Sequence, residues 1–266
     1  MPDNDALVPS ARDGAVLTLT LNRPDARNAL SEGLMAALQS ALGDAADDKS
    51  IRAIIIAANG PAFCAGHDLK EMTPHRKDKD RGRAYYDALL KQCAKLMQTI
   101  VRLPKPVIAQ VHGIATAAGC QLVASCDLAV AAEGARFATP GVNIGLFCST
   151  PMVALSRVVA RKPALEMLLT GELIPAAEAV RIGLVNRAVP ADGLDAEVAA
   201  LARKIMAKSS FVLAIGKAAF YRQAELGLAE AYAYTSAVMT RNMMAADAAE
   251  GIDAFIAKRE PHWRGC

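Results

Sequence analysis

The sequence lacks several features that mark specialised classes of protein. Aromatic residues make up only 5% of its 266 residues, and its apolar runs stop well short of the roughly 20 residues that a membrane-spanning helix needs. Thirty lysine and arginine residues against 27 acidic ones leave a net charge of +3, and the positive charges are scattered. We therefore expect neither a membrane partner nor a nucleic-acid partner. A hydrophobic content of 53% argues against disorder.

Patterns typical of metal sites and disulfide frameworks are also missing. The six cysteines form no C-x-x-C pair and the four histidines form no H-x-x-x-H pair. This predicts reduced thiols and no metal site. The amino terminus is acidic and has no basic start followed by an apolar stretch, so neither a secretory signal nor a transit peptide is expected. The expected location is a reducing compartment, most simply a bacterial cytoplasm.

The nucleotide-binding and hydrolase signatures G-x-G-x-x-G, G-x-x-x-x-G-K-[ST], G-x-S-x-G and H-E-x-x-H do not occur either. What the first half does contain is strand and helix in alternation. Apolar, β-branched runs at 51–58, 106–113 and 128–132 predict buried strands, and helix-like segments at 31–42, 83–102 and 115–126 lie between or before them. This pattern predicts an α/β fold on a mostly parallel sheet.

The second half changes character. Apart from a short strand expected at 184–188, it is Ala-rich and helical, with candidate helices at 163–170, 175–182, 192–207, 210–226 and 228–257. We expect a core over residues 1–200 and a carboxy-terminal helical region over 201–266. The one charge-dense segment, 71–84, is interpreted as a solvated mobile loop, or alternatively as a lid over a site.

Two loops of small residues each follow an expected buried strand. They are residues 62–70 (AFCAGHDLK) and 112–121 (HGIATAAGCQ). Small residues allow close approach of the backbone to a ligand, and a helix that begins there presents free N–H groups. One N–H from each loop could hold a developing thioester oxyanion. Ordinary tight turns, and a plain capping box formed by Asp68 and Glu71, are the alternatives.

A set of motifs resembles the crotonase (enoyl-CoA hydratase/isomerase) superfamily and occurs in that family's order. The motifs are 21–30 (LNRPDARNAL), 63–72 (FCAGHDLKEM), 103–113 (LPKPVIAQVHG), 119–127 (GCQLVASCD), 169–171 (LTG), 183–186 (GLVN) and 255–259 (FIAKR). The resemblance implies a crotonase-type spiral of ββα turns and a helical carboxy-terminal region that drives trimerisation, as a homotrimer or a dimer of trimers. It also implies an acyl-CoA thioester as partner and a role in fatty acid metabolism.

The same resemblance assigns roles to particular residues. The backbone N–H groups of His67 and Ala118 match the family's oxyanion hole. Coenzyme A is implied as part of the substrate, with no further cofactor. The positions that match the family's substrate-binding residues are Ala26, Arg27, Ala65, Gly66, His67, Asp68, Leu69, Lys70 and Ala118, together with Phe255 and Lys258 of the last helix, often from a neighbouring subunit. For Lys258 a solvated surface charge is the alternative.

Two positions depart from the family's hydratases, which place two glutamates around the attacking water. Gln121 stands where the first is expected and Gly141 where the second is. Neither can transfer a proton near pH 7, so efficient hydration is not expected. If the loops keep the family's geometry, a Gln121→Glu, Gly141→Glu double variant should gain hydration rate.

Other residues near those two positions are candidates for chemistry. Cys148, Ser149 and Thr150 are candidate substitutes for the missing carboxylates or simple pocket lining, and the neutral imidazole of His67 is a candidate base. Two functions remain open. The first is an acyl-CoA enzyme of the hydratase/isomerase group with a nonstandard catalytic set, which we favour. The second is a non-catalytic acyl-CoA binder or regulator.

Overall fold

The computed structural model describes residues 6–266. Most of the acidic amino-terminal segment, on which the expected lack of a targeting signal rested, lies outside the described residues. All six cysteines are free thiols. Over the described residues, no helix combines the length and the apolar character needed to cross a membrane. Nor do the His, Cys, Asp and Glu side chains of that part of the chain form a group of three or more suited to a metal ion.

Ten strands and eleven α-helices make up the described chain, with four short 3₁₀ helices. The strands are β1 (Ser10–Asp13), β2 (Val16–Leu21), β3 (Ala53–Ala58), β4 (Ala62–Cys64), β5 (Val107–Val111), β6 (Ile114–Thr116), β7 (Leu128–Ala132), β8 (Arg136–Ala138), β9 (Ile174–Pro175) and β10 (Arg187–Val189). The α-helices are α1 (Glu32–Asp47), α2 (Leu69–Met72), α3 (Arg83–Arg102), α4 (Ala118–Ser125), α5 (Pro151–Val158), α6 (Arg161–Thr170), α7 (Ala176–Arg181), α8 (Leu194–Met206), α9 (Ser210–Gln223), α10 (Leu228–Met243) and α11 (Ala246–Ile256). The 3₁₀ helices are η1 (Pro24–Ala26), η2 (Thr73–Lys77), η3 (Pro140–Ile144) and η4 (Ala191–Gly193).

The strands form two sheets that are built by one repeated unit. A six-stranded sheet has the order β1-β2-β3-β5-β7-β10, and a four-stranded sheet has the order β4-β6-β8-β9. In three successive turns a strand of the larger sheet (β3, β5, β7) is followed by one of the smaller sheet (β4, β6, β8) and then by helix. In the larger sheet β5 pairs in parallel with β3 and with β7. In the smaller sheet β6 pairs in parallel with β4 and with β8. This is the ββα spiral of the crotonase fold, as expected.

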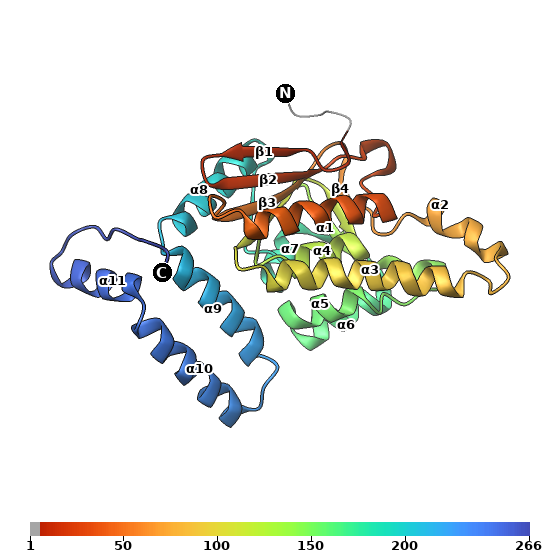
Figure 1. Ribbon diagram of the computed structural model, residues 1–266. Helices are drawn as coiled ribbons and strands as arrows, with labels where there is room; N and C mark the ends of the chain where they lie inside the picture. The colour runs from red at the N-terminus through yellow and green to blue at the C-terminus, as the bar shows by residue number, and fades with distance from the viewer. Residues whose placement is uncertain (1–5) are drawn as a thin grey trace.

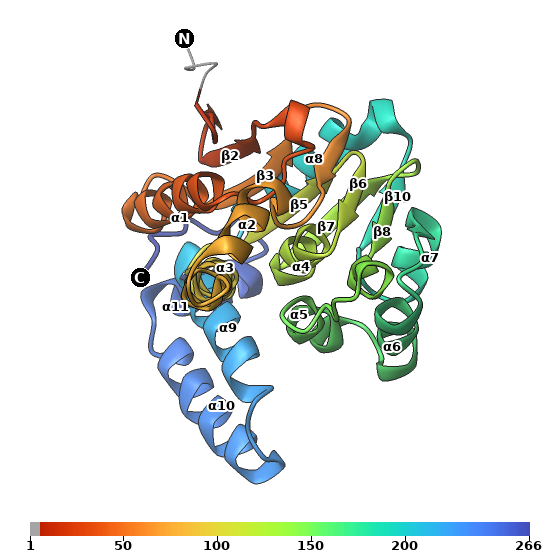
Figure 2. The same cartoon turned by 90° about the vertical axis from the view of Figure 1, so that its right-hand side faces the viewer.

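Burial explains why the larger sheet is continuous and apolar. β3 reads AIIIAA and buries its first four residues, as a strand covered on both faces should. Helices α1 and α3 pack on one side in the main hydrophobic core, and α8 covers the other side through Leu194, Val198 and Ala202 (Figure 2). Ser31 caps α1 by accepting a hydrogen bond from the N–H of Leu34.

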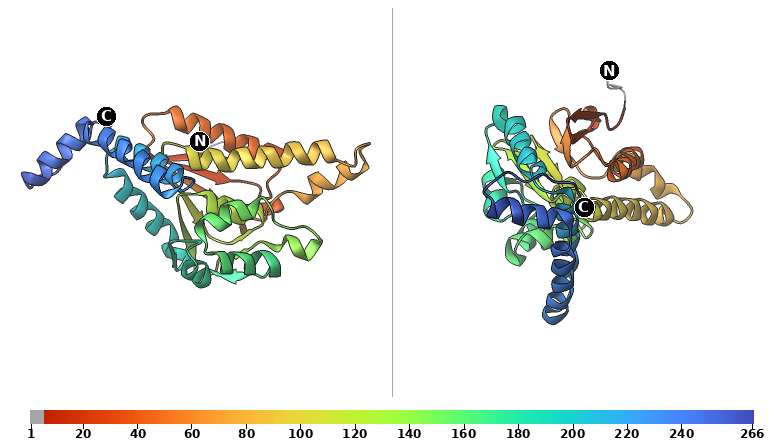
Figure 3. Two further views of the ribbon diagram at one scale, coloured as in Figure 1. Left: turned by 90° about the horizontal axis from the view of Figure 1, so that it is seen from below. Right: turned by 60° about the vertical axis from the view of Figure 1, so that its left-hand side comes forward.

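The last three helices leave this core. Helices α9, α10 and α11 extend to one side of the sheets, and α11 lies at the far end of the molecule from α2 (Figures 1 and 3). Helices α9 and α10 pack side by side as a hairpin. The expected division at residue 200 falls inside α8, which packs on the larger sheet with the core.

Three segments differ from the expected pattern for tertiary reasons. The expected helix over 228–257 is two helices, because Asp247 in the first turn of α11 is buried and bonded to the hydroxyl of Ser209 and to backbone N–H groups near the carboxy terminus. The strand expected at 184–188 begins later, as β10 (Arg187–Val189). The two residues expected to start it, Leu184 and Val185, are instead buried in the main hydrophobic core. The segment 71–84 is partly helical: its residues belong to the end of α2, to η2 and to the start of α3.

Candidate functional site

The first site loop, residues 65–68, follows β4 and lies against the second, which begins α4. Gly66 has a φ of +94°, and a Cβ on it would lie 2.9 Å from the Cβ of Ala117 and 3.4 Å from the backbone nitrogen of Ala118. Only glycine combines this φ with so close an approach. The glycine at position 66 therefore lets the two loops touch through their backbones.

The peptide N–H of His67 points away from Leu30, the residue with which His67 forms a β-bridge. The N–H of Leu30 donates to Gly66 O at 2.7 Å, and the N–H of Asp68 donates to Leu30 O at 3.2 Å. These two bonds form an isolated parallel bridge between Leu30 and His67. In a parallel bridge of this kind the N–H of the central residue points to the opposite side. The N–H of His67 is thus directed away from Leu30.

The N–H of Ala118 is the first in α4, so the helix itself offers it no acceptor. The preceding residue, Ala117, has φ 49° and ψ −118°, a conformation that costs a non-glycine residue of order 1–3 kcal/mol. It is held there by a 2.9 Å hydrogen bond from its N–H to Ala138 O. Gly119 packs on β4 so closely that a Cβ would lie 2.1 Å from Cys64 O. The hydrogen bond to Ala138 and the close packing of Gly119 on β4 together hold the start of α4 beside the first loop.

The third spiral turn brings its own loop to the same place. Because Ala138 ends β8 and bonds to Ala117, Thr139 and Gly141 come next to the start of α4. The sequence interpretation gave Thr139 no role, although its position after the short strand of a ββα turn was available as a signal. Thr139 is fully buried, and its hydroxyl is without a hydrogen-bond partner among the described residues.

Gln121 is buried in α4, with only 4% of its surface exposed. Its side-chain Oε1 lies 4.0 Å from the Cys93 Sγ of α3, a long and weak contact. Burial raises the pKa of the Cys93 thiol to about 12, so this thiol is neutral near pH 7. The amide at this position can orient a polar group, but it cannot act as an acid or a base near pH 7.

The space beside Gly141, where the resemblance led us to expect a missing glutamate, is filled by the chain itself. A Cβ on Gly141 would lie 2.7 Å from Leu146 O and 2.9 Å from the Sγ of Cys148. The 141–148 loop is folded back by a 2.9 Å hydrogen bond from the N–H of Leu146 to Gly141 O. A side chain at position 141 therefore requires this loop to move, which the expected gain of the double variant did not take into account.

The three candidate substitutes for the carboxylates are not activated as nucleophiles. Cys148 is buried, and burial raises the pKa of its thiol. Ser149 is exposed, and its hydroxyl makes a long 3.4 Å bond to Phe147 O. Thr150 precedes α5 without capping it through its side chain. The arrangement fits pocket lining better than nucleophilic chemistry for Cys148 and Ser149.

The remaining residues of the first loop form a polar and partly exposed rim. Asp68 is buried and caps α2, accepting from the N–H groups of Lys70 and Glu71. Glu71 does not complete a capping box, since its carboxylate accepts instead from the N–H of Glu32. Burial works against ionisation of Asp68, but the 2.9 Å ion pair with Arg23 and the two N–H bonds lower its pKa overall. Leu69 and Lys70 are exposed beside it.

The expected coenzyme A contacts fall in two separate places. Ala26 ends η1, and Arg27 follows it with a φ of 51° while its carbonyl accepts from the N–H of Ala65 at 3.1 Å. This brings Ala26 and Arg27 to the first loop. Phe255 is 85% exposed and lies with Lys258 at the end of α11, far from α4 of the same chain (Figure 1). A single chain does not bring those two residues to the loops.

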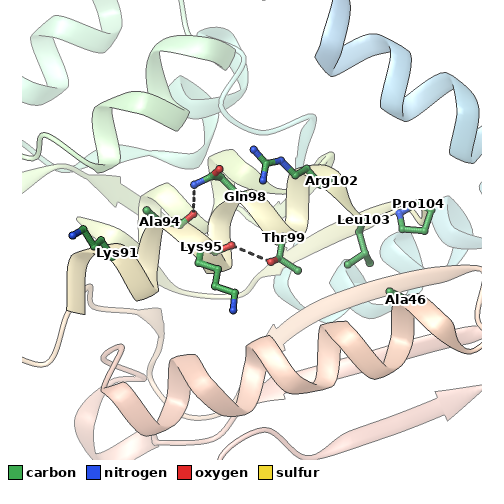
Figure 4. A pocket seen from close by; sticks show the side chains of 9 residues that line it. All are labelled: Ala46, Lys91, Ala94, Lys95, Gln98, Thr99, Arg102, Leu103 and Pro104. Carbon is green, nitrogen blue, oxygen red and sulfur yellow. Dashed lines mark hydrogen bonds between the residues drawn. The ribbon is translucent and has the colours of Figure 1, made fainter. Parts of the chain in front are cut away.

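A separate surface hollow of 460 Å³ lies between α1 and α3 (Figure 4). It is lined by Ala46, Lys91, Ala94, Lys95, Gln98, Thr99, Arg102, Leu103 and Pro104, none of which belongs to the site loops. The side chains of Gln98 and Thr99 donate to carbonyl groups of their own helix (Figure 4). The hollow is therefore not a candidate for the chemistry described above.

Known proteins resemble this chain over nearly its whole length. Residues 11–266 match the family described as Enoyl-CoA hydratase/isomerase. Enoyl-CoA hydratase domain-containing protein 3, mitochondrial, is 50% identical in Xenopus laevis over 252 residues (95% of this chain, 84% of that protein). The human protein of that name is 50% identical over 248 residues (93% and 80%). The crystal structure of an enoyl-CoA hydratase from Mycobacterium smegmatis is similar with a TM-score of 0.92 and 56% identity, covering 97% of this chain and 98% of that one.

These comparisons overturn one expectation. The cytoplasmic location expected from the sequence is wrong by this measure, because the relatives from Xenopus laevis and human are named as mitochondrial proteins. The physical reason is that free thiols indicate only reducing surroundings, and they do not distinguish one reducing compartment from another.

Proposed function

The chain belongs to the enoyl-CoA hydratase/isomerase family, and from this premise we propose that it binds acyl-CoA thioesters with the thioester oxygen between the N–H groups of His67 and Ala118. Three observations support this role. The N–H of His67 points away from Leu30, the N–H of Ala118 begins a helix, and Gly66 brings the two segments into backbone contact. Two such donors would stabilise negative charge on the oxygen as it develops.

The chemistry that we propose is that of an acyl-CoA enzyme other than a standard hydratase. Hydration needs one group to deprotonate water and another to deliver a proton to the α-carbon. The observation that carries the proposal is the crowding at Gly141, where backbone and thiol occupy the space for a second carboxylate. Gln121 supplies an amide at the other position. The remaining oxyanion hole would assist enolisation or other reactions of the polarised thioester.

Coenzyme A enters this proposal as part of the substrate. Ala26, Arg27 and residues 65–70 are proposed to line its site on one chain, and Phe255 and Lys258 to reach the site of a neighbouring copy. Support comes from the projecting helices, on which Phe220, Tyr232, Met244 and Phe255 are 65%, 69%, 83% and 85% exposed. Apolar side chains this exposed indicate a surface that another chain covers. A homotrimer or a dimer of trimers would provide that cover.

The first test measures binding and hydration together. We expect the purified chain to bind crotonyl-CoA in calorimetry but to hydrate it slowly, because each missing acid–base group typically costs about 10²–10⁴-fold in rate. A member of the family that carries both glutamates is the reference for rate. Hydration as fast as the reference would contradict the assignment of missing groups, and failure to bind would remove the proposed function itself.

A second test concerns the double variant. The structure leads us to expect that Gln121→Glu with Gly141→Glu does not restore hydration, because a Cβ at position 141 meets a backbone carbonyl at 2.7 Å. We expect a lower melting temperature instead, as overpacking typically costs about 1–3 kcal/mol. Gln121→Glu alone is the matched control, and it should melt closer to the parent. A hydration rate restored by about 10²-fold or more in the double variant would show that the 141–148 loop moves easily.

The alternative function is a non-catalytic acyl-CoA binder or regulator. Gly141 and Gln121 favour it, because both positions lack a proton-transferring side chain. A binder would hold crotonyl-CoA and leave every acyl proton in place, whereas an enzyme of the group would exchange or move one.

A further inference from the structure

The segment that links α2 to α3 concentrates the positive charge of the chain. Residues 76–83 (RKDKDRGR) contain five basic residues and two acidic ones, a net charge of +3 that equals the net charge of the whole chain. Basic and acidic residues are therefore equal in number over the rest of the sequence. The five basic residues are all exposed, and they are Arg76, Lys77, Lys79, Arg81 and Arg83. The expectation of no membrane partner rested on scattered charges and did not weigh this segment, which we call the basic turn.

The acidic side chains of the basic turn are bonded locally, whereas its basic side chains are not. A carboxylate oxygen of Asp78 lies 2.8 Å from the Nδ1 of His75. Asp80 accepts hydrogen bonds from the N–H groups of Gly82 and Ala84 at 3.0 and 2.8 Å. In the part of the chain that the structure describes, none of the five basic side chains makes a hydrogen bond or an ion pair. Their charges are therefore available to an external anionic partner.

Contacts to the start of α3 hold the basic turn in one shape. The ring of His75 stacks on that of Tyr85, with 3.5 Å between the ring centroids. The hydroxyl of Tyr86 donates to Met72 O at 3.2 Å. Gly82 has a φ of +83°, and a Cβ on it would lie 2.7 Å from Cε2 of Tyr86, so the backbone packs directly on that ring. The five positive charges are thus presented together on a projection at the end of the molecule opposite α11 (Figures 1 and 3).

We propose that the basic turn binds this protein peripherally to a membrane surface that carries anionic lipid headgroups. Each basic side chain near such a surface typically raises the affinity about fivefold, so a net charge of +3 corresponds to about 10²-fold. The shape of the segment favours a membrane over a folded acidic protein. A lipid surface attracts charges that project toward it, whereas a specific protein interface needs basic groups fixed by pairing, and these five have no bonds that fix them.

Membrane binding through the basic turn adds to the proposed function and does not depend on it. One short helix, α2, connects the turn to Asp68, which caps that helix and belongs to the rim of the proposed acyl site. Peripheral binding would therefore keep this rim close to a bilayer. The acyl chains of thioester substrates are apolar and enter bilayers, so the site would lie beside a surface where such substrates collect.

The test measures co-sedimentation of the full chain with vesicles of phosphatidylcholine and phosphatidylglycerol, and with vesicles of phosphatidylcholine alone. We expect the parent to bind only the anionic vesicles and to leave them at about 1 M NaCl, where the Debye length falls to about 3 Å. The triple variant Arg76→Gln, Lys77→Gln, Lys79→Gln removes the net charge of the turn and should lower the affinity for anionic vesicles about 10²-fold. Because these three side chains make no bonds, the variant should fold like the parent, which circular dichroism checks.

The matched control removes the same total charge from separate parts of the surface. Lys49, Lys162 and Lys204 are exposed and lie outside the basic turn. The triple variant Lys49→Gln, Lys162→Gln, Lys204→Gln should bind anionic vesicles within about threefold of the parent, because charges further from the bound surface than a Debye length are screened. Equal loss of affinity in the two triple variants would show that net charge, and not the turn, governs binding, and it would overturn the proposal.

Parallel calorimetry with crotonyl-CoA separates membrane binding from the proposed function. Loss of vesicle binding in the turn variant, with the dissociation constant of crotonyl-CoA unchanged, would support the membrane role. A turn variant that binds vesicles like the parent would overturn it, and so would a parent that does not bind anionic vesicles. Binding of the parent to polyglutamate but not to vesicles would overturn it in favour of an acidic protein partner. Weaker binding of crotonyl-CoA by the turn variant, with vesicle binding intact, would overturn it in favour of a contact with the phosphates of coenzyme A.

Discussion

Gly119→Ala is expected to weaken acyl-CoA binding about tenfold or more and to destabilise the fold by about 1–3 kcal/mol. A Cβ at this position would lie 2.1 Å from Cys64 O and 2.8 Å from the carbonyl carbon of the same residue. Both are backbone atoms, so no side-chain rotation relieves the contact. The first turn of α4 must move away from β4, and the N–H of Ala118 moves with it. Calorimetry with crotonyl-CoA and a thermal melt followed by circular dichroism measure the two effects.

Gly43→Ala is the matched control for this substitution. Gly43 is exposed in the interior of α1, and a Cβ there meets no atom within 4 Å. Alanine should stabilise that helix by about 0.5–1 kcal/mol and leave binding unchanged. If Gly119→Ala binds crotonyl-CoA as tightly as the parent at a temperature where both are folded, the proposed oxyanion hole does not depend on this contact.

Much of the spiral could be predicted because its elements are specified locally. The apolar run at 51–58 contains β3, and the helix-like segment predicted at 83–102 coincides with α3, whose bounds match the expectation. Gly66 and Gly119 stand where backbones approach, and small residues after a buried strand are a sequence signal for such contact. The two site loops were therefore recognisable before their mutual position was known.

Features that depend on contacts between distant segments could not be predicted. The sequence shows a glycine at position 141 but not that Leu146 and Cys148 fill the space beside it. Nor does it show that Nε2 of His67 is buried without a partner, since burial of a ring nitrogen depends on every segment around it. The break between α10 and α11 likewise depends on Asp247 meeting Ser209, 38 residues earlier in the chain.

The projecting helices are attached to the core through one buried ion pair. The Nζ of Lys217 in α9 lies 2.6 Å from a carboxylate oxygen of Asp127 and also donates to the carbonyl oxygens of Ile100 and Lys105. Asp127 in turn accepts from the N–H of Val107 and from the hydroxyl of Tyr221. This network joins the end of α3 and the starts of β5 and β7 to α9.

Removal of the lysine should therefore be among the most damaging single changes in the chain. We expect Lys217→Met to lower the free energy of unfolding by about 3–5 kcal/mol, because it leaves a buried carboxylate and two carbonyl groups without their partner. The side chain of Lys217 is only 7% exposed and that of Asp127 14%, so water does not easily replace the ammonium group. Urea unfolding followed by circular dichroism gives the difference directly.

Two companion variants distinguish the ion pair from a general effect of losing a lysine. Lys204→Met, at an exposed position of α8, should change the free energy of unfolding by no more than about 0.5 kcal/mol. Combining Lys217→Met with Asp127→Asn removes the unpaired charge and should recover part of the loss. If Lys217→Met is as stable as Lys204→Met, the network does not anchor α9. The helices that carry Phe255 and Lys258 would then depend for their position on contacts with other copies of the chain.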